Sequence, residues 1–194
     1  MSNRGARIVI WLSAGLVVLF GIGTFLEEDD HSRCETLNSL AVAEERDREG
    51  YNRDDFGTYD REALLEASEE QNEGKYYSVF DDKLYDDAGE VDVDHVVALA
   101  EAWDSGIDSD DMKTYGGDTT NLVLLTDSVN QSKGDKDAAE WQPTDNVAYY
   151  VDIYITTKRR YNLSVDQVEL EALQELVATL SGAELKEVCV PSGR

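Results

Sequence analysis

The chain has few of the side chains that bind soft metals or form disulfides: two cysteines and two histidines among 194 residues. Cys34 and Cys189 lie 155 positions apart, so no CxxC knuckle exists. With only His31 and His95 beside them, the sequence does not support a structural zinc site of four nitrogen and sulfur ligands. Any metal ion must therefore be held mainly by oxygen atoms.

Basic residues are also scarce, because 17 Lys and Arg face 42 Asp and Glu, a formal net charge of −25. This balance argues against a conventional nucleic-acid-binding protein, which neutralises phosphates with a basic face. It resembles the surfaces of halophilic proteins, because salt near 1 M shortens the reach of repulsion to about 3 Å. We interpret the charge first as an adaptation to solvent and expect a halophilic archaeon as the source. The 41% hydrophobic content excludes a wholly disordered chain, and the length suits one domain.

The N-terminal region contains a stretch without charge, residues 8–26, which follows Arg4 and Arg7 and precedes four acidic residues. Nineteen residues exceed a usual signal-peptide core and suffice to span a bilayer. The charges on either side place the N-terminus inside and the remaining chain outside. We expect a retained membrane anchor with its domain outside the cell, or a secreted domain if the segment is cleaved.

An external location bears on the two cysteines. Cys34 and Cys189 flank the exported part, so a disulfide between them would join its two ends in an oxidising environment. The alternative is a pair of free buried thiols, and the spacing does not decide between them.

The hydrophobic pattern predicts an α+β fold. Helices are expected at 35–46, 59–70, 146–160 and 165–180, and strands at 76–80, 91–93 and 121–125. Asp127 or Ser128 could cap a short helix beginning there, and Ser164 with Gln167 forms a capping box for the last helix. We divide the chain into an anchor or signal peptide (1–26), an acidic linker with the first helix (27–50) and the main domain (51–190).

Asp94 and His95 directly follow an alternating Val and Asp run, an unusual place for a lone histidine in a simple core. Asn121 opens the next buried strand, and Asn130 lies on the short helix after it. Two strands and a helix could bring these side chains to one point. Adjacent strand residues point to opposite faces, so Asp94 and His95 can cooperate only if the strand ends or bulges there.

These residues resemble the motif of the HNH endonucleases, the ββα-metal nucleases, and more narrowly of secreted HNH proteins. The matching segments are residues 92–106 (DVDHVVALAEAWDSG), 121–122 (NL), 130–135 (NQSKGD) and 141–143 (WQP), and the resemblance extends over about 51–189. Two departures exist: Ala98 stands where the family often has Pro, and an Arg common before the middle Asn is absent near 113–118. They affect loop geometry and phosphate contacts more than the core residues.

The resemblance implies a ββα-metal core among flanking helices, with His95 as general base. Imidazole titrates near pH 6.5, so a neutral ring can take a proton from attacking water. Asp94 and Asn130 would be the ligands of one divalent cation, with Mg²⁺ first and Mn²⁺ as an alternative. Asn121 would brace the loop and orient the histidine. We expect Lys133 to be a further catalytic residue.

Candidates for phosphate contact are Lys133 and Lys136, and more weakly Arg53 and Arg61; the alternative for each is a solvated charge. The segments 130–136 and 158–160 are the places near these residues where basic side chains equal or outnumber acids. Asp92 is expected to be structural. The sequence thus predicts a metal-dependent endonuclease acting outside the cytoplasm on nucleic acid, DNA before RNA. No protein partner is inferred, and the membrane contact is through 8–26.

Two other classes compete with this interpretation. A catalytically silent extracellular binding module could keep the HNH scaffold, although the presence of Asp94, His95 and Asn130 together argues against it. A Ca²⁺ module could use the Asp-rich loops at 81–87 and 104–111, but neither has the spacing of an EF-hand loop.

Overall fold

The computed structural model describes residues 37–180. The predictions for residues 8–26, His31, Cys34 and Cys189 lie outside this range. Among the described residues, no helix is long and apolar enough to cross a membrane.

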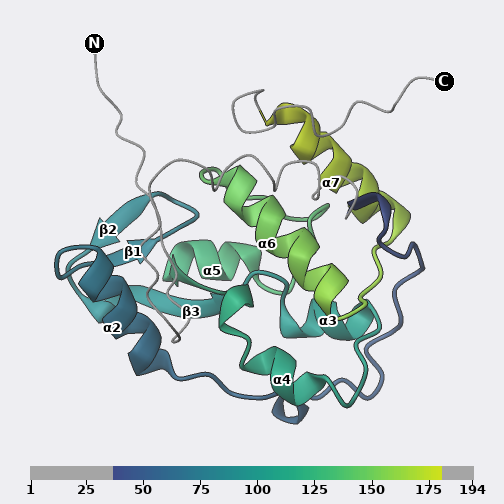
Figure 1. The fold of residues 1–194 in the computed structure, drawn as a ribbon, viewed down its shortest axis with the longest axis horizontal. Coiled ribbons are helices and arrows are strands. Elements are labelled where there is room, and N and C mark those ends of the chain that lie inside the picture. The colour runs from purple at the N-terminus through teal and green to yellow at the C-terminus, as the bar shows by residue number, and fades with distance from the viewer. Residues whose placement is uncertain (1–36, 181–194) are drawn as a thin grey trace, which may run out of the picture.

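The fold is α+β, as predicted, with helices around two small sheets (Figure 1). The elements in chain order are η1 (Arg53–Asp55), α2 (Arg61–Gln71), β1 (Tyr76–Ser78), β2 (Lys83–Tyr85), η2 (Ala88–Glu90), β3 (Val91–His95), α3 (Leu99–Asp104), α4 (Met112–Gly116), η3 (Thr119–Asn121), β4 (Leu122–Thr126), α5 (Asp127–Lys133), α6 (Val147–Arg160) and α7 (Gln167–Thr179). The predicted helices 59–70, 146–160 and 165–180 correspond to α2, α6 and α7. The predicted strands correspond to β1, β3 and β4.

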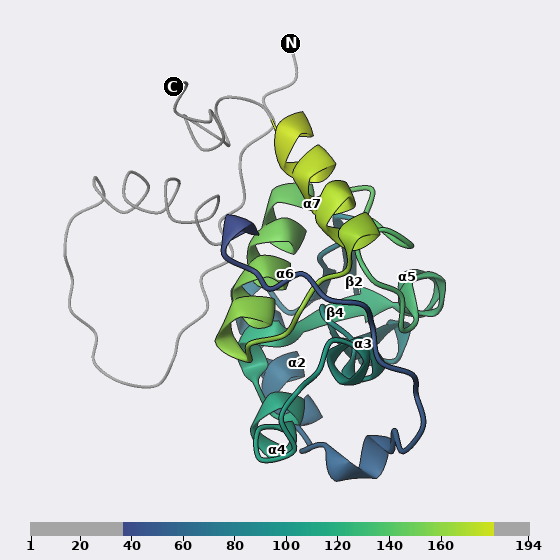
Figure 2. The same ribbon diagram turned by 90° about the vertical axis from the view of Figure 1, so that its right-hand side faces the viewer.

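The central sheet pairs β3 with β4 in antiparallel register, from Val91 opposite Thr126 to His95 opposite Leu122. The alternation of Val and Asp in β3 gives the sheet two different faces. Val91 and Val93 pack with Leu64 of α2 in a small apolar cluster on one face. The opposite face carries Asp92 and Asp94 and lies against α5 (Figure 2). β3, β4 and α5 thus form a ββα unit.

A larger core lies between the sheet and helices α3, α6 and α7. A buried ion network ties these helices together: Lys158 of α6 is 0% exposed and donates to Glu101 of α3 at 2.5 Å and to Glu169 of α7 at 3.1 Å. Lys158 belongs to the segment 158–160, in which basic residues outnumber acids, but its charge is paired inside the protein. The network fixes α3, which directly follows the β3 end of the sheet.

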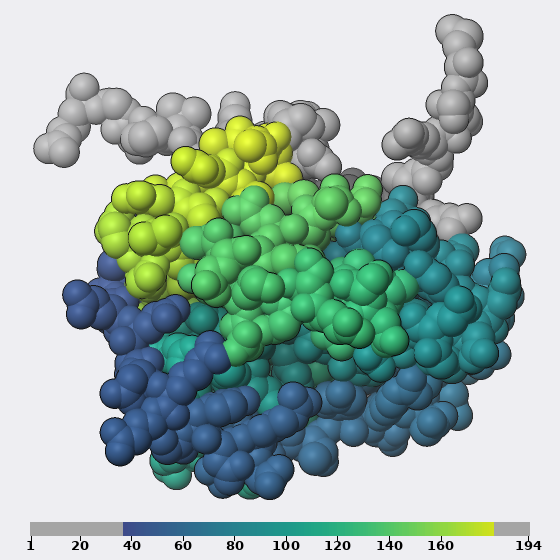
Figure 3. Space-filling model, turned by 180° about the vertical axis from the view of Figure 1, so that it is seen from behind, coloured from purple at the N-terminus to yellow at the C-terminus, as the bar shows by residue number. Residues whose placement is uncertain are grey.

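The expected helix at 35–46 is wrong for most of its described part, because only residues 37–38 are helical. From residue 41 the chain is extended and forms a parallel bridge between Val42 and Val165. Ala43 N donates to Val165 O at 3.0 Å, so the loop before α7 satisfies this backbone. In Figure 3 the purple and blue N-terminal residues accordingly run along the edge of the molecule below the yellow α7. The charged residues that follow have no apolar face that a helix could bury.

The capping prediction for the last helix is also wrong. Asp166 is the N-cap of α7, and its carboxylate accepts from Glu169 N at 2.7 Å. Ser164 instead donates to the carbonyl of Ser105 at 3.1 Å. Both residue types cap helices well, and the tertiary contact of Ser164 leaves the position to Asp166.

Candidate active site

The ββα unit brings the predicted side chains to one cleft. A cleft of about 300 Å³ is lined by Asp94, His95 and Asn130, together with Tyr51, Arg53 and Asp135. Asp94 and His95 point from opposite faces of β3, but the strand ends at His95. Both side chains therefore reach the same opening at the end of the strand, as their cooperation required.

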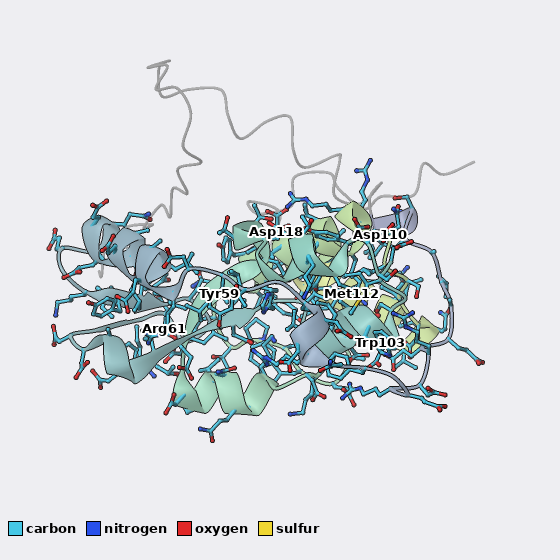
Figure 4. The ribbon with its side chains drawn as sticks, turned by 90° about the horizontal axis from the view of Figure 1, so that it is seen from below. Tyr59, Arg61, Trp103, Asp110, Met112 and Asp118 are labelled. Carbon is cyan, nitrogen blue, oxygen red and sulfur yellow. The ribbon has the colours of Figure 1, made fainter. Side chains whose placement is uncertain are left out.

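His95 is buried, with 4% of its surface exposed, and one of its nitrogens has a fixed partner. Nε2 lies 3.1 Å from the carbonyl oxygen of Gly116. A carbonyl can only accept, so Nε2 carries the hydrogen and Nδ1 of the neutral ring is left as the acceptor. The ring also stacks on that of Tyr115, with 6.1 Å between the ring centroids, and packs edge-on against the ring of Tyr59, with 5.7 Å between the centroids. Figure 4 shows Tyr59 between Arg61 on one side and Met112 on the other.

Burial lowers the pKa of His95 from 6.5 to about 4, while the Gly116 carbonyl and the Asp94 carboxylate act in the opposite direction. The imidazole is therefore neutral at pH 7 and able to accept a proton.

Asp94 forms an ion pair with a buried lysine. Nζ of Lys133 lies 2.7 Å from Asp94 Oδ2 and 3.3 Å from the carbonyl of Gly134. Lys133 is 1% exposed, whereas Asp94 is 20% exposed toward the cleft. Lys133 thus belongs to the site, but its ammonium faces Asp94 in this arrangement.

Asn130 is oriented by Asp92. Its Nδ2 donates to Asp92 Oδ2 at 3.2 Å, so its amide oxygen is the atom left for a ligand. Asp92, expected to be structural, is thus placed to orient Asn130. The Asp94 carboxylate and the Asn130 amide oxygen are hard donors that fit Mg²⁺ or Mn²⁺.

Asn121 is fully buried and holds the turn that follows β3. Its Oδ1 accepts from Val97 N at 2.9 Å, and its Nδ2 donates to Val97 O at 3.1 Å. Its own carbonyl accepts from Val96 N at 2.8 Å. These three bonds fix the backbone immediately after His95.

The candidates for phosphate contact separate into two groups. Arg53 lines the cleft, and Lys136 is partly buried, with Nζ 2.6 Å from Ser132 O. Arg61 instead donates to the carbonyls of Ala88 and Val91 at 3.1 and 3.0 Å. Figure 4 places Arg61 on the α2 side of the molecule, well away from Trp103 on α3. The structure therefore gives Arg61 a structural task outside the cleft.

Sequence reasoning missed Gly116, whose carbonyl holds His95. Its backbone packs directly on Gly57: a methyl group on Gly116 would lie 2.5 Å from Gly57 N and closer still to Gly57 O. Only glycine fits this approach. The sequence does show two glycine sites, Gly116-Gly117 and Phe56-Gly57. Their positions along the chain do not predict that Gly57 and Gly116 are in contact. Asp135, paired with Arg48, was also not identified as lining the cleft.

The α+β domain thus carries a ββα unit whose cleft is lined by a buried histidine and by hard oxygen donors. Residues 43–176 match the family of GmrSD restriction endonucleases, C-terminal domain. The chain belongs to this family, which is a family of nucleases and therefore has nucleic acid as its substrate. The chain is also 32% identical over 167 residues to an Arthroderma benhamiae protein named "Uncharacterized secreted protein". That match covers 74% of this chain and 82% of the relative. No solved structure matches the chain.

Proposed function

We propose that the protein is an HNH-type endonuclease that hydrolyses phosphodiester bonds of DNA with the help of one divalent cation. The observation that carries this proposal is the convergence at one cleft of neutral His95 with the oxygen donors of Asp94 and Asn130. Nuclease-family membership supports the reaction class. RNA is the second candidate substrate.

In the proposed step, His95 Nδ1 removes a proton from the water that attacks phosphorus. Gly116 holds the ring by its Nε2–H, and the neighbouring Asp94 carboxylate stabilises the imidazolium that forms. Asn121 keeps the turn after His95 in place, so the base does not move during proton transfer. Asp94 and Asn130 would hold the cation, Mg²⁺ or Mn²⁺, which supplies charge stabilisation at the phosphate and the leaving oxygen.

Basic side chains have a smaller part in this proposal than the cation. Arg53 in the cleft wall and the partly buried Lys136, which follows the cleft residue Asp135, would contact phosphate oxygens. Lys133 would neutralise and position Asp94, which makes it a positioning residue for the cation ligand.

We place the activity outside the cytoplasm, with the domain anchored by residues 8–26 or secreted. The uncharged N-terminal stretch supports this location, and so does the relative whose printed name includes "secreted". The acidic composition supports a salty environment, so assays belong in high salt.

The full chain incubated with plasmid DNA and Mg²⁺ or Mn²⁺ in high salt should cleave it, and a chelator should stop cleavage. His95→Ala should lower the rate by about 10²–10⁴-fold, because the general base is lost. His31→Ala changes the only other histidine and should cleave like the wild type. Full activity of His95→Ala would refute the assignment, and a wild-type chain that binds DNA without cutting it would favour the silent binding module.

A further inference from the structure

The cleft is small, and its proposed reactive side chains lie deep in it. Its volume of about 300 Å³ is at the lower end of the range of small-ligand pockets and fits about one nucleotide. His95 is only 4% exposed and Asp94 20% exposed. A duplex is stiff and presents its phosphates on a broad convex surface, whereas an unpaired strand can bend into such a recess.

Positive charge is scarce in this cleft. Arg53 is the only basic residue among those that line it, and its side chain is exposed. The guanidinium of Arg53 forms no hydrogen bond or ion pair with any other described residue, so it is available to an anionic ligand. One arginine can hold one phosphate, but it cannot supply the several phosphate contacts on which duplex binding depends.

An aromatic ring lies two residues before this arginine in the same cleft wall. Tyr51 is half-buried and packs against Phe56, with 6.1 Å between ring centroids and 54° between planes, and against Trp103, with 6.2 Å and 64°. Neither neighbour is parallel to Tyr51, so no aromatic ring of residues 37–180 stacks on it face to face. Its hydroxyl also has no hydrogen-bond partner in that range.

The backbone that carries Tyr51 and Arg53 is held in place. Asn52 lies between them and caps η1, with its side-chain oxygen accepting from Asp54 N at 3.1 Å. Lys113 of α4 donates to the carbonyls of Asp54 and Phe56 at 3.0 and 3.3 Å. A segment fixed in this way loses little conformational entropy when a ligand binds.

We propose that the cleft selects an unpaired nucleic-acid strand, with Tyr51 stacking on the base next to the cleaved phosphate and Arg53 binding a phosphate of that strand. This inference rests on the nuclease function proposed above and names its substrate class. In a duplex each base is already stacked on its neighbours, so Tyr51 could reach a base face only after that base is unstacked, which costs free energy.

Stacking also suits a protein of this charge. A base and a tyrosine ring carry no net charge, so the acidic surface does not oppose their contact. Salt weakens phosphate contacts and leaves stacking available as a source of affinity. The ring of Tyr51 can therefore contribute to binding under conditions in which Arg53 alone is screened.

Fluorescence anisotropy tests the proposal on the full chain carrying His95→Ala, with Mn²⁺ in high salt, so that the strand is bound without being cut. A labelled oligothymidylate should bind at least about tenfold more tightly than the same strand paired with oligodeoxyadenylate, because the duplex must first be unstacked. Equal or tighter binding of the duplex would overturn the proposal, as would no measurable binding of either form.

An abasic strand of the same length isolates the base, because it keeps the phosphates and lacks the thymines. Loss of the bases should weaken binding about 5- to 100-fold when Tyr51 is present, and much less in Tyr51→Leu. Tyr51→Phe is the matched control, because it keeps the ring and should show the same loss as the parent. An equal loss in Tyr51→Leu and the parent would refute stacking on Tyr51, whatever the stability of the variant.

Arg53→Gln separates the phosphate contact from the stacking contact. It should weaken binding of the oligothymidylate and of the abasic strand by the same factor, because the arginine acts on phosphate. A loss confined to the strand with bases would place the base on Arg53 and overturn the assignment of Tyr51.

Cleavage by the wild type is scored separately, so the two proposals can fail independently. A negatively supercoiled plasmid opens locally, and its cleavage is compatible with an unpaired substrate. A wild type that cuts plasmid while the duplex binds as tightly as the single strand would keep the nuclease and remove the strand selection. Selective single-strand binding without cleavage of any strand would remove the nuclease function and keep the binding site.

Discussion

Replacing Gly116 with alanine tests whether the carbonyl bonded to His95 is what places the base. The added methyl group would lie 2.5 Å from Gly57 N, where carbon needs roughly 3.5 Å from a neighbouring heavy atom. Both contacting atoms are backbone, so no flexible side chain can move away. The segment carrying Gly116 must therefore shift by about 1 Å relative to Gly57.

Two effects of different size should follow from this shift. Overpacking of backbone against backbone costs about 1–3 kcal/mol of unfolding free energy. Displacement of the carbonyl by about 1 Å releases or turns the imidazole, and a misplacement of that size lowers kcat about 10²-fold. The proposed cation ligands Asp94 and Asn130 do not contact Gly116 by any hydrogen bond in the described residues, so metal affinity should change little.

The assay is plasmid cleavage at saturating Mn²⁺, with Mn²⁺ affinity and Tm measured on the same preparations. Gly117→Ala is the control, because its methyl group would meet Thr58 O at 3.1 Å, a contact that a few tenths of an ångström relieves. A Gly116→Ala protein that loses Tm but keeps wild-type kcat would show that the Gly116 carbonyl does not position the base.

The remaining predictions concern pH and the turn after β3. Because the pKa of His95 is lowered to about 4, kcat/KM should stay level from pH 8 to about 5 and fall toward pH 4, and a midpoint near 6.5 would contradict the burial argument. His95 should also contribute about 3 kcal/mol to the free energy of unfolding above pH 6.5, and this contribution is lost as the pH falls through 4. The difference in Tm between the wild type and His95→Gln, followed across that pH range, measures this contribution. Ala98→Pro should raise the unfolding free energy by about 0.4–1 kcal/mol, since φ at Ala98 is −60° and no described hydrogen bond uses its N–H; chemical denaturation that shows a loss would refute this.

The parts of the fold that local pattern determines could be predicted from the sequence. The alternating residues of β3, the apolar run of β4 and the short helix α5 follow directly from periodicity. Because β3 pairs with β4 and α5 directly follows β4, the approach of Asp94, His95 and Asn130 was also predictable. Their catalytic and metal-binding roles stay predictions.

Features that depend on contacts between distant segments could not be predicted. The segment 39–46 has helix-compatible residues, yet its backbone bonds to Val165, more than 100 positions away. The close approach of Gly57 and Gly116 has the same character, because only the folded chain brings the two glycines together. The spacing of residues within the motif predicts neither contact. The contact between Gly57 and Gly116 matters for the site, because the Gly116 carbonyl holds the proposed base.

The structure changes the interpretation of the basic residues more than that of any other feature of the sequence. The two segments with locally favourable charge, 130–136 and 158–160, suggested where an anionic substrate would bind. Yet Lys133 and Lys158 are both buried in ion pairs with acidic residues, and Arg160 pairs with Asp118 at 2.8 Å. These charges neutralise the protein itself and contribute little to phosphate binding. A surface this acidic can approach a nucleic acid productively only where a cation offsets its charge, so substrate affinity should depend on the cation proposed for the cleft more than on basic side chains.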